Sequence, residues 1–167
     1  MGIAESQNII LEKLEVLYPS YFEDRSGHFF LQWGQSSGIV LSGSGHILRD
    51  SIVKFSSGNG VSCIGKGHKI INNLISDVNF GAVDCAAINT GGAAITEEHE
   101  FAYNTIQRCG RSGITPRRGG NQTVRYVANI HHNDISLFGI QDWDVGGIYS
   151  SGDCYFARWN HNLVHDA

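Results

Sequence analysis

The densest group of reactive side chains lies in the run Gln141-Asp142-Trp143-Asp144-Val145-Gly146-Gly147-Ile148-Tyr149. Alternate residues of an extended segment share a side, so Asp142 and Asp144 are expected to project together. Two neighbouring carboxylates can divide into an acid and a base, because each disfavours the negative charge on the other. The run therefore predicts acid–base chemistry, with Trp143 and Tyr149 as surfaces on which a ring can stack.

Such side chains need a regular scaffold, and a signature that recurs along the chain predicts one. It consists of Asn, any residue and then Ile or Val, and it begins at Asn73, Asn104, Asn133 and Asn162. The spacings are 31, 29 and 29 residues, and Ser51 opens a similar triplet 22 residues before Asn73. Self-similarity at a period of roughly 20 to 50 residues is typical of a solenoid, in which each repeat packs against its neighbours.

The residues that flank the signature are in register too. Three positions before it stand the apolar residues Leu48, Ile70, Phe101, Ile130 and Trp159. Two positions after its first residue stand the β-branched residues Val53, Ile75, Ile106, Ile135 and Val164. Short β-branched runs between Gly, Asn and Ser favour strands joined by tight turns. The sequence therefore predicts an all-β fold, a parallel β-helix in which the asparagines form one column with amide-to-amide bonds.

By its length of 167 residues the chain is predicted to be one domain, 1–167, of about five to six coils of 22–31 residues. First strands are predicted at 38–42, 60–64, 85–89, 113–115 and 147–150. A weaker coil is expected from 8–16, and a long aromatic turn from 18–37. The sequence stops within a coil, so we expect it to be a piece of a longer parent chain that supplies further coils.

The turns that precede the first strands are expected to form one wall of a groove along which an extended polymer could lie. Asp84 and Arg111 fall in such turns of the two preceding coils, so they are predicted to line the same wall as Asp142 and Asp144. An Asp before Gly-Gly also suits a turn, where it can accept backbone N–H bonds, so a purely structural role for Asp144 stays open.

Eight histidines raise the question of a metal. His46, His68 and His99 each stand five positions before the Ser or Asn of the signature, and a structural stack is the favoured interpretation. His132 and His161 immediately precede Asn133 and Asn162, so they should be neighbours on adjacent coils and are candidates for substrate contact. No H-E-x-x-H spacing occurs, and neither a metal nor another cofactor is expected.

The four cysteines form no C-x-x-C pair. Cys63 and Cys85 are predicted to stack inside the barrel on adjacent first strands. Core packing is favoured over a disulfide or metal role.

The coil pattern resembles the right-handed parallel β-helix superfamily of pectate lyases and related glycoside hydrolases, over about 8–167. The Asp-x-Gly-Gly-Ile-Tyr run from Asp144 and the Asn-x-x-His-Asp tail from Asn162 resemble a pattern of its hydrolases. The resemblance implies a right-handed coil, Asp144 as the leading catalytic carboxylate, a polysaccharide or oligosaccharide substrate, and a secreted or periplasmic location. The family pattern is commonly Asp-Gly-Gly, whereas here Val145 separates Asp144 from Gly146.

The second carboxylate of such an enzyme is left open by the sequence. Asp142, Asp84, Glu97 and Glu98 compete for it, and it could also lie beyond the end of the sequence.

Three functions compete. Glycosidic-bond hydrolysis by acidic residues ranks first, and elimination on uronates by a polysaccharide lyase ranks second. Arg111, Arg117 and Arg118 could serve a lyase; the last two could grip a uronate carboxylate or could equally be a solvated turn pair. The third is a non-catalytic carbohydrate-binding or adhesin module. The net charge of −4 without charge runs argues against a nucleic-acid partner, and no apolar stretch is long enough to span a membrane.

Overall fold

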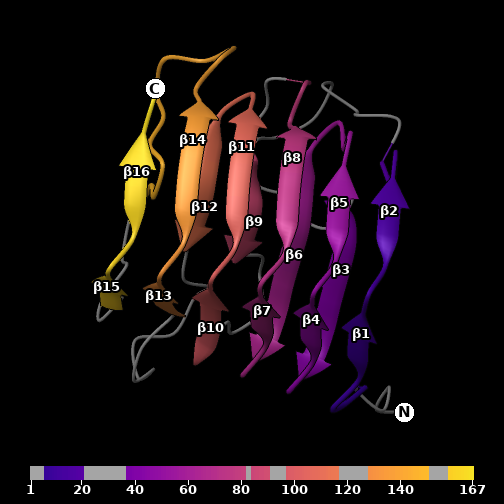
Figure 1. Cartoon of the computed structure of the whole chain (residues 1–167). Coiled ribbons are helices and arrows are strands. Elements are labelled where there is room, and N and C mark those ends of the chain that lie inside the picture. The colour runs from indigo at the N-terminus through magenta and orange to yellow at the C-terminus, as the bar shows by residue number, and fades with distance from the viewer. Residues whose placement is uncertain (1–5, 21–36, 82–83, 91–96, 117–127, 151–157) are drawn as a thin grey trace.

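The computed structural model describes residues 6–20, 37–81, 84–90, 97–116, 128–150 and 158–167. Within these ranges every regular element is a β-strand, and the strands form three sheets in which every pairing is parallel (Figure 1). Sheet A has the order β12-β9-β6-β3. Sheet B has the order β1-β4-β7-β10-β13-β15, and sheet C has the order β16-β14-β11-β8-β5-β2.

The bounds of the strands follow the three sheets. Sheet A consists of β3 (Ser37–Ser44), β6 (Asn59–Lys66), β9 (Ala86–Thr90) and β12 (Ser112–Pro116). Sheet B consists of β1 (Ile10–Glu12), β4 (Ile47–Arg49), β7 (Lys69–Ile71), β10 (His99–Ala102), β13 (Ala128–His131) and β15 (Arg158–Asn160). Sheet C consists of β2 (Glu15–Leu17), β5 (Ile52–Lys54), β8 (Leu74–Val78), β11 (Thr105–Cys109), β14 (Asp134–Phe138) and β16 (Leu163–His165).

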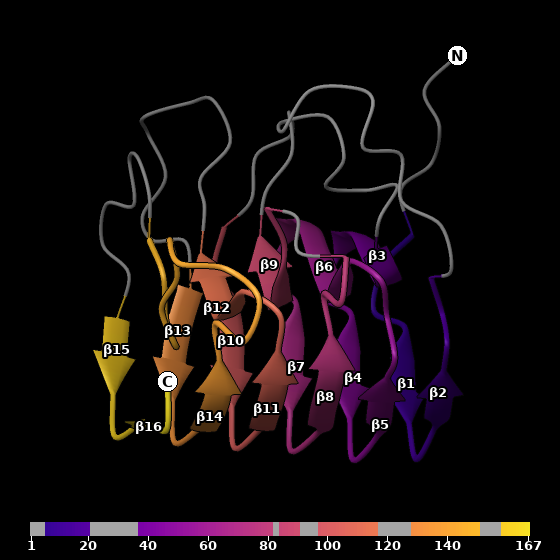
Figure 2. The same cartoon turned by 90° about the horizontal axis from the view of Figure 1, so that it is seen from above.

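From β3 to β14 the chain visits the sheets in the order A, B, C, and each strand lies beside the corresponding strand of the next passage (Figure 2). We call one such passage a repeat. An all-β chain with three all-parallel sheets in this order is consistent with a parallel β-helix, as the spacing predicted.

The predicted asparagine column is present on the turns between sheets B and C. The Nδ2 of Asn73 donates to Oδ1 of Asn104 at 3.0 Å, that of Asn104 to Asn133 at 3.0 Å, and that of Asn133 to Asn162 at 2.9 Å. Each Oδ1 also accepts the backbone N–H of the preceding member, and Ser51 N–H donates to Asn73 in the same way. One side chain per repeat thus satisfies backbone and amide groups that the turn would otherwise bury without partners.

The core consists of columns of apolar side chains, one residue from each strand. In sheet B the register aligns Leu48, Ile70, Phe101 and Ile130, and in sheet C it aligns Val53, Ile75, Ile106 and Ile135. All eight are fully buried. These are the flanking positions of the signature, so the sequence predicted the inward face of both sheets.

Left-handed backbone conformations also recur in columns, because the chain bends at the same place in each repeat. At the turn between sheets B and C, one residue of each repeat has a positive φ: Lys13 before Leu14, and Asp50, Asn72, Tyr103, His132 and His161 before the column members. Their φ values lie between 51° and 58°. This conformation directs their side chains away from the core and places them in a row along the outside of the turn.

Two predictions about sheet A need correction. The stretch 147–150 is no strand; only an isolated bridge between Ile148 and Ile114 joins it to the sheet. Cys63 does not stack on Cys85, since Cys63 pairs with Thr90, and Cys85 precedes β9. The connection from β6 to β9 is longer than the connection from β3 to β6. Residues 22 positions apart therefore no longer pair between β6 and β9. Cys63, Cys85 and Cys109 are nevertheless buried, as expected for core residues.

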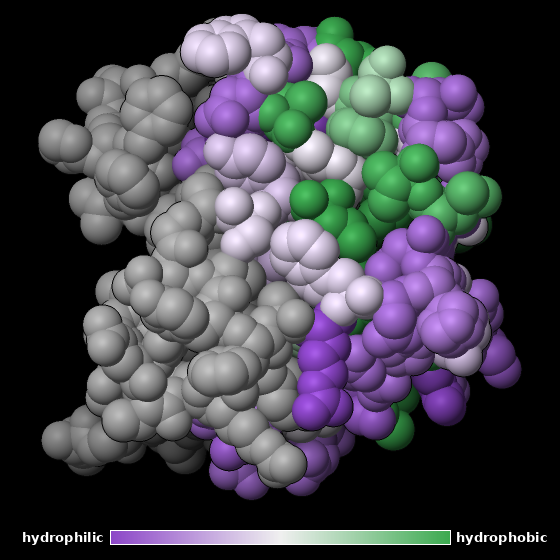
Figure 3. Space-filling view, turned by 90° about the vertical axis from the view of Figure 1, so that its left-hand side faces the viewer, coloured by the Kyte–Doolittle hydropathy of each residue, from purple (hydrophilic) through white to green (hydrophobic). Residues whose placement is uncertain are grey.

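The outermost strands β15 and β16 expose side chains at positions that are buried in the other repeats. Trp159 and Val164 are exposed, whereas their partners Ile130 and Ile135 are buried, and apolar side chains gather beside polar ones on this end of the molecule (Figure 3). In the described ranges no helix that could cross a membrane occurs.

Candidate functional site

The predicted acidic wall converges on a single guanidinium. Arg111 pairs with Asp84 through Nη1, with Asp142 Oδ2 through Nε at 3.2 Å, and with Asp144 Oδ2 through Nη2 at 2.9 Å. The Arg111 side chain is only 8 % exposed. We call these four residues together with Tyr149 the Arg111 cluster. Its members come from turns that precede sheet A in three successive repeats, which is the arrangement that the sequence predicted.

Asp144 is the carboxylate of the cluster that solvent reaches most easily. Its side chain is 53 % exposed, against 24 % for Asp142 and 13 % for Asp84. Tyr149 donates its hydroxyl to Asp144 Oδ1 at 2.8 Å, and Arg111 holds Oδ2, so both oxygens are fixed in place. The guanidinium carbon of Arg111 also lies 5.6 Å from the centre of the Tyr149 ring, within range of a cation–π contact.

Main-chain bonds position the turn that carries these aspartates. The N–H of Gly139 donates to Arg111 O at 2.7 Å, and that of Gln141 donates to Gly110 O at 3.0 Å. Gly139 has a φ of +72°, which a residue without Cβ adopts at low cost. The Asp142 carboxylate accepts the N–H of Trp143 at 2.7 Å, as an Asp in a turn commonly does. Asp142 thus helps to hold its own turn, and a purely structural role for Asp144 stays open.

Trp143 is 93 % exposed beside these carboxylates. An indole in that position has no packing role of its own, and its ring faces are open to solvent. It can therefore supply the stacking surface that the sequence predicted. Tyr149, by contrast, has its hydroxyl bonded to Asp144 and its ring beside Arg111.

The described residues on the outward face of sheet A, where a polymer was expected to lie, are mostly buried. The register aligns Val40, Ser62, Asn89 and Thr115 in one outward column, and only Val40 is exposed. The Oδ1 of Asn89 is buried and has no hydrogen-bond partner among the described residues. An accessible groove beside the cluster is therefore not formed by these strand residues.

Other predicted site residues lie apart from the Arg111 cluster. Glu97 and Glu98 precede β10 and pair with Lys66 at the other end of the first strands, at 3.2 and 3.4 Å. Arg117 and Arg118 fall outside the described residues. The cluster thus offers Asp142 and Asp84 as neighbours of Asp144, and it does not bring in Glu97 or Glu98.

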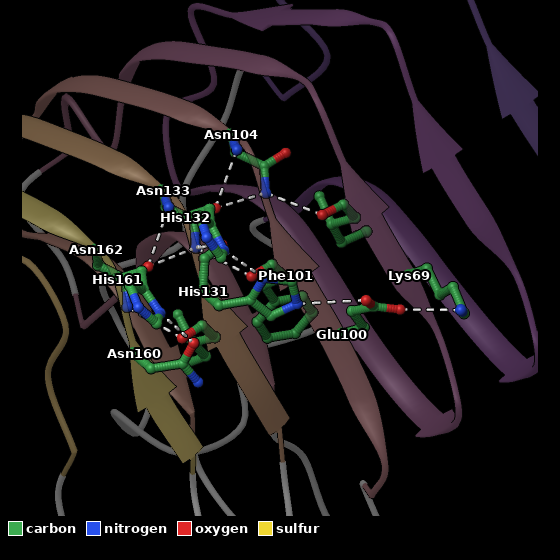
Figure 4. A network of polar contacts seen from close by, with 12 residues as sticks. Lys69, Glu100, Phe101, Asn104, His131, His132, Asn133, Asn160, His161 and Asn162 are labelled. Carbon is green, nitrogen blue, oxygen red and sulfur yellow. Dashed lines mark hydrogen bonds and ion pairs between the residues drawn. The ribbon is translucent and has the colours of Figure 1, made fainter.

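His132 and His161 lie at the opposite edge of sheet C, on the turn between sheets B and C. Their rings stack with centroids 4.9 Å apart (Figure 4). Tyr103 continues the row, with its ring centroid 5.0 Å from that of His132. Sequence reasoning missed Tyr103. It occupies the frame of His132 and His161, immediately before Asn104, and that shared position was the available signal.

A polar chain reaches the same row from sheet B. The Nζ of Lys69 lies 2.9 Å from Glu100 Oε2, and the Nε2 of His131 lies 3.3 Å from Glu100 Oε1 (Figure 4). When Nε2 of neutral His131 donates to Glu100, its Nδ1 accepts from Nδ1 of His132 at 3.0 Å. Lys69 and, more weakly, His131 lower the pKa of Glu100.

The histidines predicted as a structural stack do form one. The rings of His46, His68 and His99 lie 5.0 and 5.1 Å apart and nearly parallel. The N–H of His46 donates to Nδ1 of His68, and that of His68 donates to Nδ1 of His99. Burial lowers the pKa of His68, and it lowers the pKa of His99 to about 3. The imidazoles of His68 and His99 are therefore neutral acceptors for the backbone.

A small apolar pocket adjoins the cluster on its sheet C side and was not predicted. Its volume is about 260 Å³, and it is lined by Phe55, Asp77, Val78, Phe80, Arg108, Gly110, Ile140 and Gln141. Arg108 lowers the pKa of Asp77 through a bidentate pair at 2.5 and 2.7 Å. Within the described ranges, no group of three or more His, Cys, Asp or Glu side chains is arranged to hold a metal ion.

No protein-family model matches the chain, and neither a curated protein nor a solved structure matches it.

Proposed function

We propose that the chain is a right-handed parallel β-helix of the pectate-lyase-like superfamily, with about five to six coils of 22–31 residues, and that it hydrolyses glycosidic bonds of a polysaccharide or oligosaccharide. The observation that carries the proposal is the convergence of Asp84, Asp142 and Asp144 on Arg111 beside the exposed Trp143. Glycoside hydrolysis requires a pair of carboxylates next to a surface that holds the sugar.

In this proposal Asp144 is the leading catalytic carboxylate, since it is the most exposed of the three. Asp142 is the second carboxylate, because it binds the adjacent Nε of the same guanidinium. Arg111 and the less exposed Asp84 position the pair. Trp143 stacks on the sugar ring at the bond to be cleaved.

The charge of the cluster favours a neutral substrate over a uronate. When its ionisable side chains are charged, three carboxylates surround one guanidinium, and the formal charge of the described cluster is −2. Sugar hydroxyls can donate to these oxygens, whereas a uronate carboxylate would meet like charge. Arg111 is also buried and paired with all three aspartates, which makes it unsuited to abstract a proton as a lyase base. Both arguments rank elimination below hydrolysis.

A non-catalytic glycan-binding module is the second candidate. The observation in its favour is that Arg111 and Tyr149 engage both oxygens of Asp144, as in a permanently satisfied turn. A binding module needs the exposed Trp143 but no carboxylate that reacts. Under either function the partner is a polysaccharide or oligosaccharide. A secreted or periplasmic location is part of the proposal and is based on the resemblance alone.

The test is a screen of neutral and uronate polysaccharides that measures new reducing ends and the ultraviolet absorbance of unsaturated uronate products in the same reaction. Hydrolysis predicts reducing ends without that absorbance. Both signals together identify a lyase. Binding to a polysaccharide without either signal identifies a binding module and overturns the enzymatic proposal.

A further inference from the structure

A shallow pocket lies on the turn between sheets B and C, at the opposite edge of sheet C from the Arg111 cluster. Its volume is about 330 Å³, and it spans three successive repeats. It is lined by Asp50, Ser51, Ile52, Asn72, Asn73, Leu74, Tyr103 and Thr105. The polar column members Ser51 and Asn73 form its base, so the pocket is built on the most regular part of the fold.

One wall of the pocket is aromatic. Tyr103 has a φ of 58° and is 55 % exposed. Its ring stacks on His132 in the following repeat, at 5.0 Å with an angle of 21° between the planes. The preceding repeat places Asn72, which is no ring, at the same position of the turn. Within the described chain, no second ring stacks on Tyr103 from that side.

The rest of the pocket offers mainly hydrogen-bond acceptors. Asn72 Nδ2 donates to Asp50 Oδ1 at 2.7 Å, which fixes the amide and leaves the Asn72 Oδ1 facing away from that bond. Asp50 Oδ2 lies 3.9 Å from Arg49 Nε, beyond hydrogen-bond distance. Thr105, an exposed residue that carries a hydroxyl, lines the pocket together with Tyr103. An aromatic face thus lies next to a carboxylate, an amide and a hydroxyl.

We propose that this pocket is a second carbohydrate site, which binds one pyranose unit of a neutral oligosaccharide. A pyranose has an apolar C–H face that packs on an aromatic ring, and its hydroxyl edge donates to carboxylate and amide oxygens. The carboxylate of Asp50 disfavours an anionic sugar, so the site selects neutral units. The site does not depend on catalysis at the Arg111 cluster.

The variant that tests the site is Tyr103→Asn, because Asn removes the ring and still tolerates the left-handed backbone. The matched control is Tyr18→Asn. Tyr18 is also exposed, has a φ of 53°, and stacks on the ring of Phe55; neither residue lines this pocket. Thermal unfolding of both variants checks that each remains folded.

The measurement is the Kd for hexasaccharides of glucose, xylose, mannose and galacturonic acid, by calorimetry, in an Asp144→Asn background that prevents turnover. At least one neutral hexasaccharide is expected to bind, about tenfold more weakly to the Tyr103→Asn variant and equally to the Tyr18→Asn variant. Tyr103→Phe should retain the affinity.

The proposal is overturned if no neutral hexasaccharide binds, if the Tyr103→Asn change leaves the Kd unaltered, or if galacturonate binds more tightly and depends on Tyr103. Binding that is lost with Trp143→Ala but not with Tyr103→Asn also overturns it, because it assigns the glycan to the Arg111 cluster. If the Kd depends on Tyr103 but the wild type shows no turnover, the second site is supported and only the proposed hydrolysis is contradicted.

Discussion

At the scale of single residues, Arg111 is the side chain on which the candidate site depends. It is buried and pairs with three carboxylates, whereas most ion pairs of the described residues have at least one exposed partner. A buried charge network of this kind adds little net stability when complete, but loss of one partner leaves uncompensated charge. Replacing Arg111 is therefore expected to destabilise the protein more than replacing any other member of the cluster.

The Arg111→Ala variant is expected to lose about 3–5 kcal/mol of unfolding free energy, because Asp84 and Asp142 are left without their cation in a poorly hydrated place. Urea denaturation measures the change. Arg49→Ala is the control, since Arg49 and Glu12 form an exposed pair. The control should lose no more than about 1 kcal/mol. Equal losses in the two variants would contradict the assigned role of Arg111.

The reactive residues could be predicted in part from the sequence. The turn positions of Asp84, Arg111, Asp142 and Asp144 could be aligned because the repeat fixes which turns are neighbours. The guanidinium at the centre of the carboxylates could not be predicted, since a repeat places backbone positions and says nothing of rotamers. Whether Asp144 reacts stays a prediction. Val145, which separates Asp144 from Gly146, departs from the Asp-Gly-Gly pattern on which that prediction was based.

At the scale of elements, the turn between sheets B and C is the most regular feature of the chain. The asparagine column there was predicted from four residues and a constant frame, and its hydrogen bonds confirm it. The long turns before sheet A were harder to predict, because their lengths vary and no shared residue marks where β9 or β12 begins. That is why Cys85 was placed in a strand that begins one residue later.

The Asn104→Ala variant is expected to lose about 2–3 kcal/mol of unfolding free energy, because the backbone N–H of Asn73 and the carbonyl of Ile70 lose their buried partner. Thermal unfolding measures the loss. Asn160→Ala is the control. Asn160 is exposed on β15, and within the described residues its side chain bonds only its neighbour His161. A loss as large in the control would argue against a buried ladder.

Two glycines at the end of β6 provide a matched test of how closely the repeats approach. A Cβ on Gly65 would meet the backbone oxygen of Gly43 at 2.0 Å, and its φ is +112°. Gly67 has a φ of +68°, and a Cβ there would meet nothing within 4 Å. Gly65→Ala is therefore expected to lose about 3 kcal/mol or more, and Gly67→Ala only about 1 kcal/mol. Chemical denaturation compares them, and a reversed order would contradict the register of β3 and β6.

At the scale of the whole molecule, the stability of the parallel repeats depends on buried side chains that form columns from one repeat to the next. The buried imidazoles of His68 and His99 are such groups, because burial lowers the pKa of both. As pH falls below about 6.5, the unfolded chain takes up protons that the folded chain does not. The unfolding free energy should therefore fall with pH, and for His99 the loss continues down to about pH 3.

The expected slope from His99 is about 1.4 kcal/mol per pH unit once the unfolded imidazole is largely charged. The window from pH 6.5 to about 5 isolates it from the carboxylates. His165 contributes there with the opposite sign: Asp166 and Asp134 raise its pKa, so its stabilisation is present at low pH and is lost as pH rises through its folded pKa. Urea denaturation across the window should give a smaller slope for His99→Gln, whereas exposed His161→Gln should follow the wild type. Identical slopes for all three proteins would contradict a neutral buried stack.

The all-β class and the parallel arrangement could be predicted from the sequence, because periodicity constrains the whole chain at once. The burial of Ser62, Asn89 and Thr115 on the outer face of sheet A could not be predicted, because the repeat fixes which residues share a column and not how exposed each one is. A groove beside these strands stays a prediction. Trp143 is the exposed aromatic residue of the candidate site.

The central claim is that the Arg111 cluster breaks glycosidic bonds through Asp144, and turnover of the Asp144→Asn variant tests it most directly. On a polysaccharide that the wild type cleaves, the release of reducing ends should fall about 10²- to 10⁴-fold while the Kd for the glycan stays within about twofold. The Asp134→Asn control, which alters an equally exposed carboxylate on β14, should keep the wild-type rate. Undiminished release of reducing ends by the Asp144→Asn variant would contradict the account.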